Sequence, residues 1–137
     1  MELVKIIDGQ AKPYTLAAFR ADNKHIVYGK GLSARTLKKQ SVYYVRTLPK
    51  PEQLGKKAIA KDSPTQVSGE WVLGWDLVSL DANEARLLRN KLLDDCDWRF
   101  MSDQSPTDAW RTYRQSLRNL PAQSGFPNSV TWPTKPT

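Results

Sequence analysis

The chain has 137 residues, a length that fits one domain or two very small ones and allows a buried core. Hydrophobic residues make up 39% and charged residues 26%, and no run of about 18 apolar residues occurs, which excludes a membrane-spanning helix. The formal net charge is +7, and residues 1–80 hold 13 of the 21 basic residues against 7 of the 14 acidic ones.

The beginning of the chain and its cysteine content indicate a cellular compartment. The first residues have neither the basic region nor the long apolar stretch of a signal peptide. Cys96 is the only cysteine, so an internal disulfide cannot form, which agrees with a reducing environment. We therefore expect synthesis and residence in a cytoplasm.

Residues 1–80 predict a small basic α+β domain with an antiparallel β-sheet and short helices. The expected elements are a strand at residues 3–7 that ends at the turn Asp8-Gly9, a helix at 14–21, a short helix from the N-cap Ser33 to Lys39, and a strand at 41–46. Two further strands, 57–61 and 66–78, are expected to form an antiparallel hairpin around Asp62-Ser63-Pro64. The period-two spacing of Trp71, Leu73 and Trp75 predicts that this hairpin has one buried aromatic face.

A basic segment follows the first predicted helices. Its basic residues within 35–61 face only Glu52 among acidic residues. The candidate patch consists of Arg35, Lys38, Lys39, Arg46, Lys56 and Lys57. Such a patch is typical of a solvated surface, and it also attracts phosphates or an acidic protein surface.

Few residues suggest catalytic or metal chemistry. Gly29-Lys30-Gly31 lacks the spacing of a phosphate-binding loop, and we interpret it as a flexible turn. His25 is the only histidine, so neither a usual zinc site nor a Cys–His nucleophile can be assembled. We expect no catalytic residue, no metal and no cofactor.

One acidic group is a candidate for metal or acid–base chemistry. It consists of Asp94, Asp95, Asp97 and Asp103, whose spacing does not match a calcium loop. We interpret it as a polar loop after a helix. Some of its carboxylates are expected to pair with Arg99, Arg111 or Arg114.

Residues 81–137 predict an αα-hairpin followed by an extended arm. Asp81 is the expected N-cap of the first helix, with Glu84 at the capping-box position, and this helix is expected to end near Asp94-Asp95. The second helix is expected to begin at Ser105-Pro106-Thr107-Asp108, with Ser105 as its cap, and to end at Pro121. After Pro121, three further prolines exclude a helix, and an arm that packs Phe126 and Trp132 onto the hairpin is expected.

The second helix of the hairpin carries two neighbouring arcs of side chains. Trp110, Tyr113, Leu117 and Leu120 lie on one arc, and Arg111, Arg114 and Arg118 lie on the next. Trp110 and Leu117, together with Trp98 from the connection, are assigned to the hairpin core. The Arg114 guanidinium is placed to cover the Trp110 indole. Arginine beside aromatic residues is typical of protein interfaces, so the pattern favours protein binding over catalysis.

The motifs of this part together resemble a known family. They are Asp97-Trp98, the segment from Trp110 to Pro121, Gly125-Phe126-Pro127 and Trp132-Pro133. They are similar to the C-terminal signature of bacteriophage tail assembly chaperone proteins, a group that overlaps in usage with tail fibre assembly proteins. The resemblance covers residues 84–133, while residues 1–80 resemble the family more loosely.

The resemblance implies a non-enzymatic protein of the host cytoplasm during phage assembly. Its partner would be a phage tail fibre, tail-tip or baseplate polypeptide, whose folding, oligomerisation or attachment it would assist. The expected contact residues are Arg111, Tyr113, Arg114 and Arg118, with Phe126 and Trp132 as supports.

Two alternatives remain open at this stage. The protein could be a permanent structural component of the virion, as an adaptor or cap of the baseplate or fibre. It could also bind nucleic acid through residues 35–61, although the phage resemblance argues against this. No membrane partner is expected.

Overall fold

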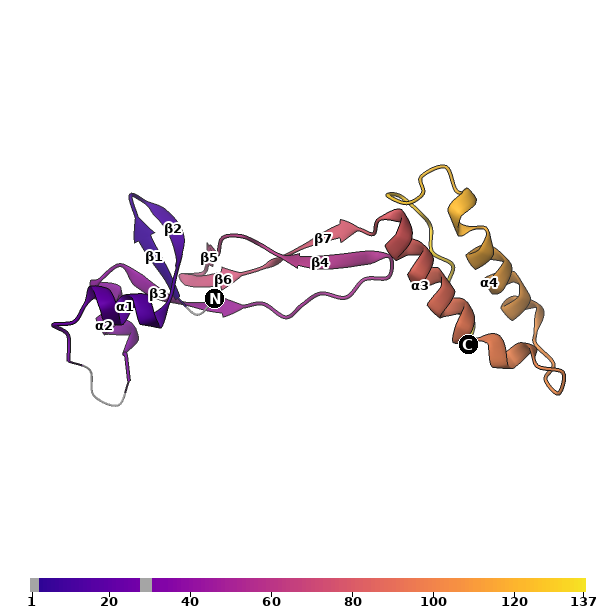
Figure 1. The fold of residues 1–137 in the computed structure, drawn as a ribbon, viewed down its shortest axis with the longest axis horizontal. Helices are drawn as coiled ribbons and strands as arrows, with labels where there is room; N and C mark the ends of the chain where they lie inside the picture. The colour runs from indigo at the N-terminus through magenta and orange to yellow at the C-terminus, as the bar shows by residue number, and fades with distance from the viewer. Residues whose placement is uncertain (1–2, 28–30) are drawn as a thin grey trace. The chain divides into compact units, whose positions relative to one another are not determined.

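The computed structural model describes residues 3–27 and 31–137 and has the expected α+β fold (Figure 1). The chain divides into two compact units. Unit 1 consists of Met1–Pro51 and Ala58–Asp76, and unit 2 consists of Glu52–Lys57 and Leu77–Thr137. The division into domains 1–80 and 81–137 stays a prediction.

A five-stranded sheet organises unit 1, with the strand order β2-β1-β3-β6-β5. Its strands are β1 (Leu3–Ile7), β2 (Gln10–Tyr14), β3 (Val42–Thr47), β5 (Thr65–Val67) and β6 (Glu70–Leu73). Strand β1 pairs antiparallel with β2 and β3, and β5 pairs antiparallel with β6. Strands β3 and β6 pair in parallel, with Val45 opposite Trp71, so the sheet is mixed, with antiparallel pairing elsewhere as predicted.

The predicted long strand at residues 66–78 is three strands. Ser68 and Gly69 have φ values of +49° and +84°, and this left-handed pair turns the chain between β5 and β6. After Gly74 the chain continues as β7 (Trp75–Ser79), which pairs with β4 (Lys56–Ala60) in a two-stranded sheet. Val72 and Leu73, neighbours on β6, are both buried, so the predicted single buried face is wrong. The turn at Ser68-Gly69 and the break at Gly74 divide this segment, so the period-two spacing of Trp71, Leu73 and Trp75 does not define one buried face.

Strand β2 was not expected from the sequence because it contains Pro13 and has no alternating apolar pattern. Its place in the sheet explains how the proline is tolerated. Strand β2 lies at the edge of the five-stranded sheet, where one side of its backbone has no strand neighbour. A residue without an N–H group is accepted at such an edge.

The helices of unit 1 begin at capping residues and cover its core. Thr15 caps α1 (Leu16–Asp22), and Ser33 caps α2 (Ala34–Lys39) by accepting a hydrogen bond from the Thr36 N–H, as predicted. The core consists of Leu3, Phe19, Leu37 and Val42. Of the predicted turn Gly29-Lys30-Gly31, the first two residues lie outside the described part of the chain.

Unit 2 is the predicted helical hairpin. Helix α3 (Ala82–Asp94) and helix α4 (Asp108–Arg118) lie side by side in Figure 1, and the 3₁₀ helix η1 (Asp97–Phe100) lies in their connection. The capping box of Asp81 and Glu84 is present as predicted. Among the described residues, no helix is long and apolar enough to cross a membrane.

The second helix of the hairpin differs from the prediction at both ends. Its N-cap is Thr107 rather than Ser105, and no side chain caps it. It ends at Arg118, and the chain continues as the 3₁₀ helix η2 (Leu120–Ala122), which contains Pro121. Proline is compatible with the first turn of such a helix, so the chain tightens there instead of leaving the helix at once.

Candidate functional site

The buried seam of unit 2 joins α4 to the end of α3. It consists of Cys96, Trp110, Tyr113 and Leu117, and the rings of Trp110 and Tyr113 meet edge to face with centroids 5.7 Å apart. Trp110 and Leu117 are therefore core residues, as predicted. Tyr113 is only 5% exposed, so its prediction as an exposed contact residue is wrong. The apolar stripe of α4 is wide enough to bury Tyr113 together with Trp110 and Leu117.

The Arg114 side chain is a structural clamp rather than a free guanidinium. Only 12% of it is exposed, and its Nη1 donates to the Asp97 carboxylate at 2.6 Å and to the Leu93 carbonyl at 3.0 Å. It also contacts the Cys96 sulfur at 3.3 Å and lies 4.7 Å from the Phe100 ring centroid. The expectation that Arg114 is free to bind is wrong, because the Leu93 carbonyl of α3 and the Asp97 carboxylate of η1 already hold it.

The surroundings of this clamp also favour its charged form. Burial by itself would lower the pKa of Arg114, but the hydrogen bonds from its guanidinium to Cys96 and Asp97 outweigh burial and raise that pKa. The guanidinium stays charged. It therefore supplies a fixed positive charge opposite Asp97 and no proton-transfer chemistry.

The other two arginines of α4 remain on the surface. Arg111 pairs with Asp108 at 2.8 Å, with 58% of its side chain exposed, and Arg118 is exposed in the last turn. A surface ion pair of this kind contributes little stability and leaves the guanidinium accessible. Only Arg111 lies at the connection end of α4, since Arg118 is about 10 Å farther along the axis at 1.5 Å per residue.

The C-terminal arm packs its aromatic residues onto the hairpin, as predicted. Trp132 contacts the buried seam, and the Arg86 guanidinium lies 5.2 Å from the Phe126 ring centroid. The Gln123 side chain holds Thr131 through two hydrogen bonds of 2.9 and 2.8 Å, which closes the arm into a loop. Phe126 and Trp132 are both partly buried, so they act as supports within unit 2.

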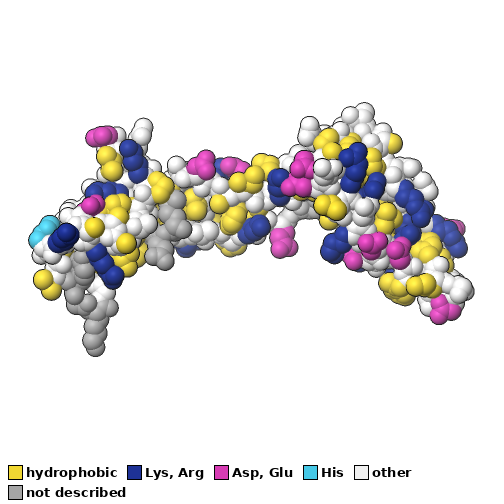
Figure 2. Space-filling view, in the orientation of Figure 1, with side chains coloured by type: hydrophobic (Ala, Val, Ile, Leu, Met, Phe, Trp, Pro, Cys, Tyr) yellow, Lys and Arg dark blue, Asp and Glu magenta, His cyan; other side chains and the backbone are white. Residues whose placement is uncertain are grey.

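The connection between the helices exposes an apolar group, which we call the connection cluster. It consists of Trp98, Phe100 and Met101, which are 52%, 36% and 59% exposed. Figure 2 shows hydrophobic side chains gathered at this end of the hairpin, beside acidic and basic ones. The assignment of Trp98 to the core is therefore wrong. The η1 turn directs Trp98 outward, while Trp110 occupies the buried seam.

The connection cluster is held in place by an arginine. The Arg99 guanidinium lies 4.4 Å from the Trp98 ring centroid and 4.0 Å from that of Trp110. The predicted stacking of Arg114 on Trp110 is wrong, because Arg99 occupies that position. Trp98 is therefore exposed and yet fixed against the hairpin, so ordering it on binding costs little entropy.

A small pocket borders the connection cluster. Its volume is about 200 Å³, and it is lined by Trp98, Arg99, Gln104, Ser105, Pro106, Thr107, Trp110 and Thr137. Aromatic walls with a few hydroxyl and amide groups suit one side chain of a partner polypeptide. The sequence signal for this surface is three large apolar residues inside a short Asp- and Ser-rich connection, a pattern that also fits core packing.

Two of the four carboxylates of the acidic group form ion pairs. Asp97 pairs with Arg114, one of the partners expected from the sequence, and Asp95 pairs with Lys91 at 3.1 Å. Within residues 3–27 and 31–137, no three His, Cys, Asp or Glu side chains are grouped closely enough to hold a metal ion.

The predicted basic patch does not form one surface of unpaired charges. Arg46 pairs with Glu70 at 3.3 Å, Lys57 pairs with Glu84 at 2.7 Å, and Lys56 donates to Ser79 at 2.9 Å. The ion pair with Lys57 and the hydrogen bond from the Asp81 backbone lower the pKa of Glu84. Lys56 and Lys57 belong to unit 2, and the exposed Arg35, Lys38 and Lys39 lie on α2 of unit 1.

Unit 2 is thus a helical hairpin that presents fixed aromatic and arginine side chains, the composition of a protein-binding module. Residues 82–137 match the model of the phage tail assembly chaperone protein family, which confirms the resemblance predicted from the C-terminal motifs. A tail assembly chaperone family is a non-enzymatic kind of protein, and the match supports a role in phage tail assembly. No curated protein and no solved structure matches the chain.

Proposed function

We propose that the protein binds a phage tail fibre, tail-tip or baseplate polypeptide in the host cytoplasm and assists its folding, oligomerisation or attachment without catalysis. The family match over residues 82–137 supports a tail assembly role. The nature of the client and the binding surface are our proposals.

The observation that carries this proposal is the connection cluster. Its side chains are large and exposed, yet the Arg99 guanidinium lies over both the Trp98 and the Trp110 rings and so fixes Trp98. Exposed aromatic residues with low conformational freedom are the usual hot spots of protein interfaces. The 200 Å³ pocket beside Trp98 would accept one side chain of the client, and Arg111 would lie at the edge of the contact.

This surface replaces part of the contact set expected from the sequence. Tyr113 and Arg114 are held inside the hairpin, and Phe126 and Trp132 support the arm. Arg111 and Arg118 keep accessible guanidiniums, but Arg118 lies away from the connection. We therefore assign the main contact to Trp98, Phe100 and Met101, with Arg111 beside them.

Capture of the client tests the proposal. A tagged protein is expressed in phage-infected cells, and the captured tail polypeptides are quantified by mass spectrometry. The double variant Trp98→Ser/Met101→Ser is expected to capture about tenfold less client, because two hot-spot side chains are lost. Both positions are exposed, so the fold should keep its circular dichroism spectrum and melting temperature.

The matched control is Leu87→Ser, which removes a 69% exposed leucine from α3 outside the connection cluster. It is expected to capture as much client as the unaltered protein. Equal capture by the double variant and the unaltered protein would show that the connection cluster is not the client site. Capture of no tail polypeptide by any form of the protein would refute the proposed function itself.

A further inference from the structure

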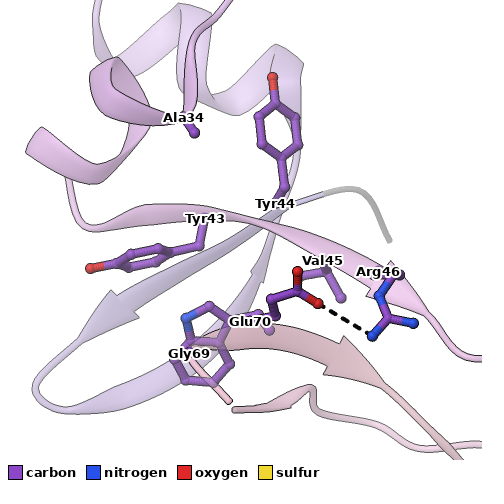
Figure 3. Close-up of a pocket in the computed structure, with 8 residues that line it drawn as sticks. Ala34, Tyr43, Tyr44, Val45, Arg46, Gly69 and Glu70 are labelled. Atoms are coloured by element: carbon purple, nitrogen blue, oxygen red, sulfur yellow. Dashed lines mark hydrogen bonds and ion pairs between the residues drawn. The ribbon is translucent and has the colours of Figure 1, made fainter. Parts of the chain in front are cut away.

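Unit 1 contains a pocket on strands β3 and β6 that the hairpin function does not use (Figure 3). Its volume is about 380 Å³, nearly twice that of the pocket beside Trp98. The lining residues are Ala34, Tyr43, Tyr44, Val45, Arg46, Gly69, Glu70 and Trp71. All of them belong to unit 1, and we call this site the sheet pocket.

The walls of the sheet pocket are aromatic. The rings of Tyr43 and Trp71 lie with centroids 6.2 Å apart and planes inclined by 44°. The Tyr44 hydroxyl donates to the Leu32 carbonyl at 2.8 Å, which fixes this half-exposed ring between solvent and the pocket. The Trp71 Nε1–H is buried and has no acceptor among the described residues, so this wall carries an unused hydrogen-bond donor.

The lining of the sheet pocket carries one charge of each sign, and helix α2, which contributes Ala34 to the lining, adds basic residues. Arg46 and Glu70 pair at 3.3 Å across its edge, as Figure 3 shows, and both side chains are more than half exposed. Ala34 lies in the lining at the start of α2, and Lys38 lies four residues later on the same helix face. Arg35 and Lys39 are also exposed on α2, a helix without any acidic residue.

We propose that the sheet pocket binds a polypeptide segment in which an aromatic side chain is flanked by Asp or Glu residues. The aromatic walls provide the apolar contact, and the basic residues of α2 attract the flanking carboxylates. A main-chain carbonyl of the segment would accept a hydrogen bond from the Trp71 Nε1–H, which has no acceptor among the described residues. The site is separate from the connection cluster, so it does not depend on the proposed function.

The same features disfavour a single-stranded nucleic acid as the occupant. A nucleic-acid strand carries a phosphate at every residue, so it would place phosphates beside the Glu70 carboxylate as well as beside α2. A peptide can keep its carboxylates on the side of α2 and present neutral amides, which can donate hydrogen bonds to Glu70. A polypeptide therefore fits the sheet pocket better.

Fluorescence anisotropy with defined probes tests the inference on the full chain. The probe is a labelled glutamate-rich peptide with one central Trp, compared with a peptide in which Ala replaces this Trp and with a labelled oligothymidylate. We expect the Trp peptide to bind at low salt at least about fivefold more tightly than either comparison probe. Its affinity should fall as the salt concentration rises.

Two variants and one matched control locate the site. Lys38→Glu reverses the charge on the Ala34 face of α2, and Ala34→Trp fills the pocket from an exposed position, so each should lower the affinity about tenfold. Lys24→Glu makes the same charge change at an exposed position of unit 1 outside the lining and should change the affinity less than about twofold.

The outcomes separate the proposal from its alternatives. Tighter binding of the oligothymidylate, weakened by Lys38→Glu, would overturn the proposal in favour of a nucleic-acid site. Absence of peptide binding at low salt would also overturn it. An equal loss of affinity in Lys24→Glu would show attraction to net charge alone, without a pocket.

Discussion

Replacement of Arg114 by Met is expected to lower the free energy of unfolding by about 1–2 kcal/mol, because it removes the donor from the partly buried Leu93 carbonyl and from the Asp97 carboxylate. In the folded chain the guanidinium holds the Asp97 carboxylate and the Leu93 carbonyl, and only 12% of the side chain is exposed. Methionine keeps much of the apolar contact with Phe100, so the loss reports the hydrogen bonds. Urea unfolding followed by far-ultraviolet circular dichroism measures it.

The matched control is Arg118→Met, one turn farther along the same helix at an exposed position. We expect it to change the free energy of unfolding by less than about 0.5 kcal/mol, as is usual for surface substitutions. If both variants lose the same stability, Arg114 is not a structural clamp. It would then again be a candidate for direct contact with the client.

Replacement of Gly55 by Ala is expected to cost about 3 kcal/mol, of which about 1–2 kcal/mol is the strain of a left-handed residue. Gly55 has φ +77°, and a Cβ there would overlap Nε1 of Trp132 and lie 2.6 Å from its Cδ1. The indole would have to leave its place against the buried seam of unit 2. The melting temperature of the full chain is expected to fall by several degrees.

Gly9→Ala isolates the backbone contribution. Gly9 has φ +76°, nearly the same as Gly55, but a Cβ there would meet no atom within 4 Å. We expect a loss of about 1 kcal/mol, from backbone strain alone. If Gly55→Ala and Gly9→Ala lose the same stability, a side chain at residue 55 does not displace Trp132, and the steric part of this prediction is wrong.

Local signals in the sequence predicted the parts of the fold that depend on neighbouring residues. Ser33 caps α2, and the Asp81–Glu84 capping box begins α3, because these hydrogen bonds form within one helical turn. The seam residues Trp110 and Leu117 were found from the 3.6-residue period of α4. The packing of Phe126 and Trp132 onto the hairpin followed from the aromatic content of a proline-rich arm.

Features that depend on distant residues were not predicted. The parallel pairing of β3 with β6 joins residues more than twenty positions apart, and only the tertiary fold decides it. Strand β2 has no sequence pattern of its own and depends on β1. Most of the candidate site shares this difficulty.

For the same reason, Arg114 was predicted to be exposed although it is enclosed, and Trp98 was predicted to be buried although it is exposed. A helical arc shows which side chains share a face, but it does not show whether the connection covers that face. In this hairpin η1 returns Asp97 and Phe100 to Arg114, so the arginine is enclosed and Trp98 is turned outward. Three large apolar residues beside Asp97 in a short polar connection were the available signal for an exposed binding surface.

Site-specific photo-crosslinking tests most directly the claim that the connection cluster binds a tail polypeptide. A benzophenone amino acid is placed at residue 98 or, as the matched control, at residue 87, since both native side chains are more than half exposed. In phage-infected cells we expect residue 98 to form a crosslink to one tail fibre, tail-tip or baseplate polypeptide, and residue 87 to form none. A crosslink to that polypeptide from residue 87 alone, or none from residue 98, would contradict the account.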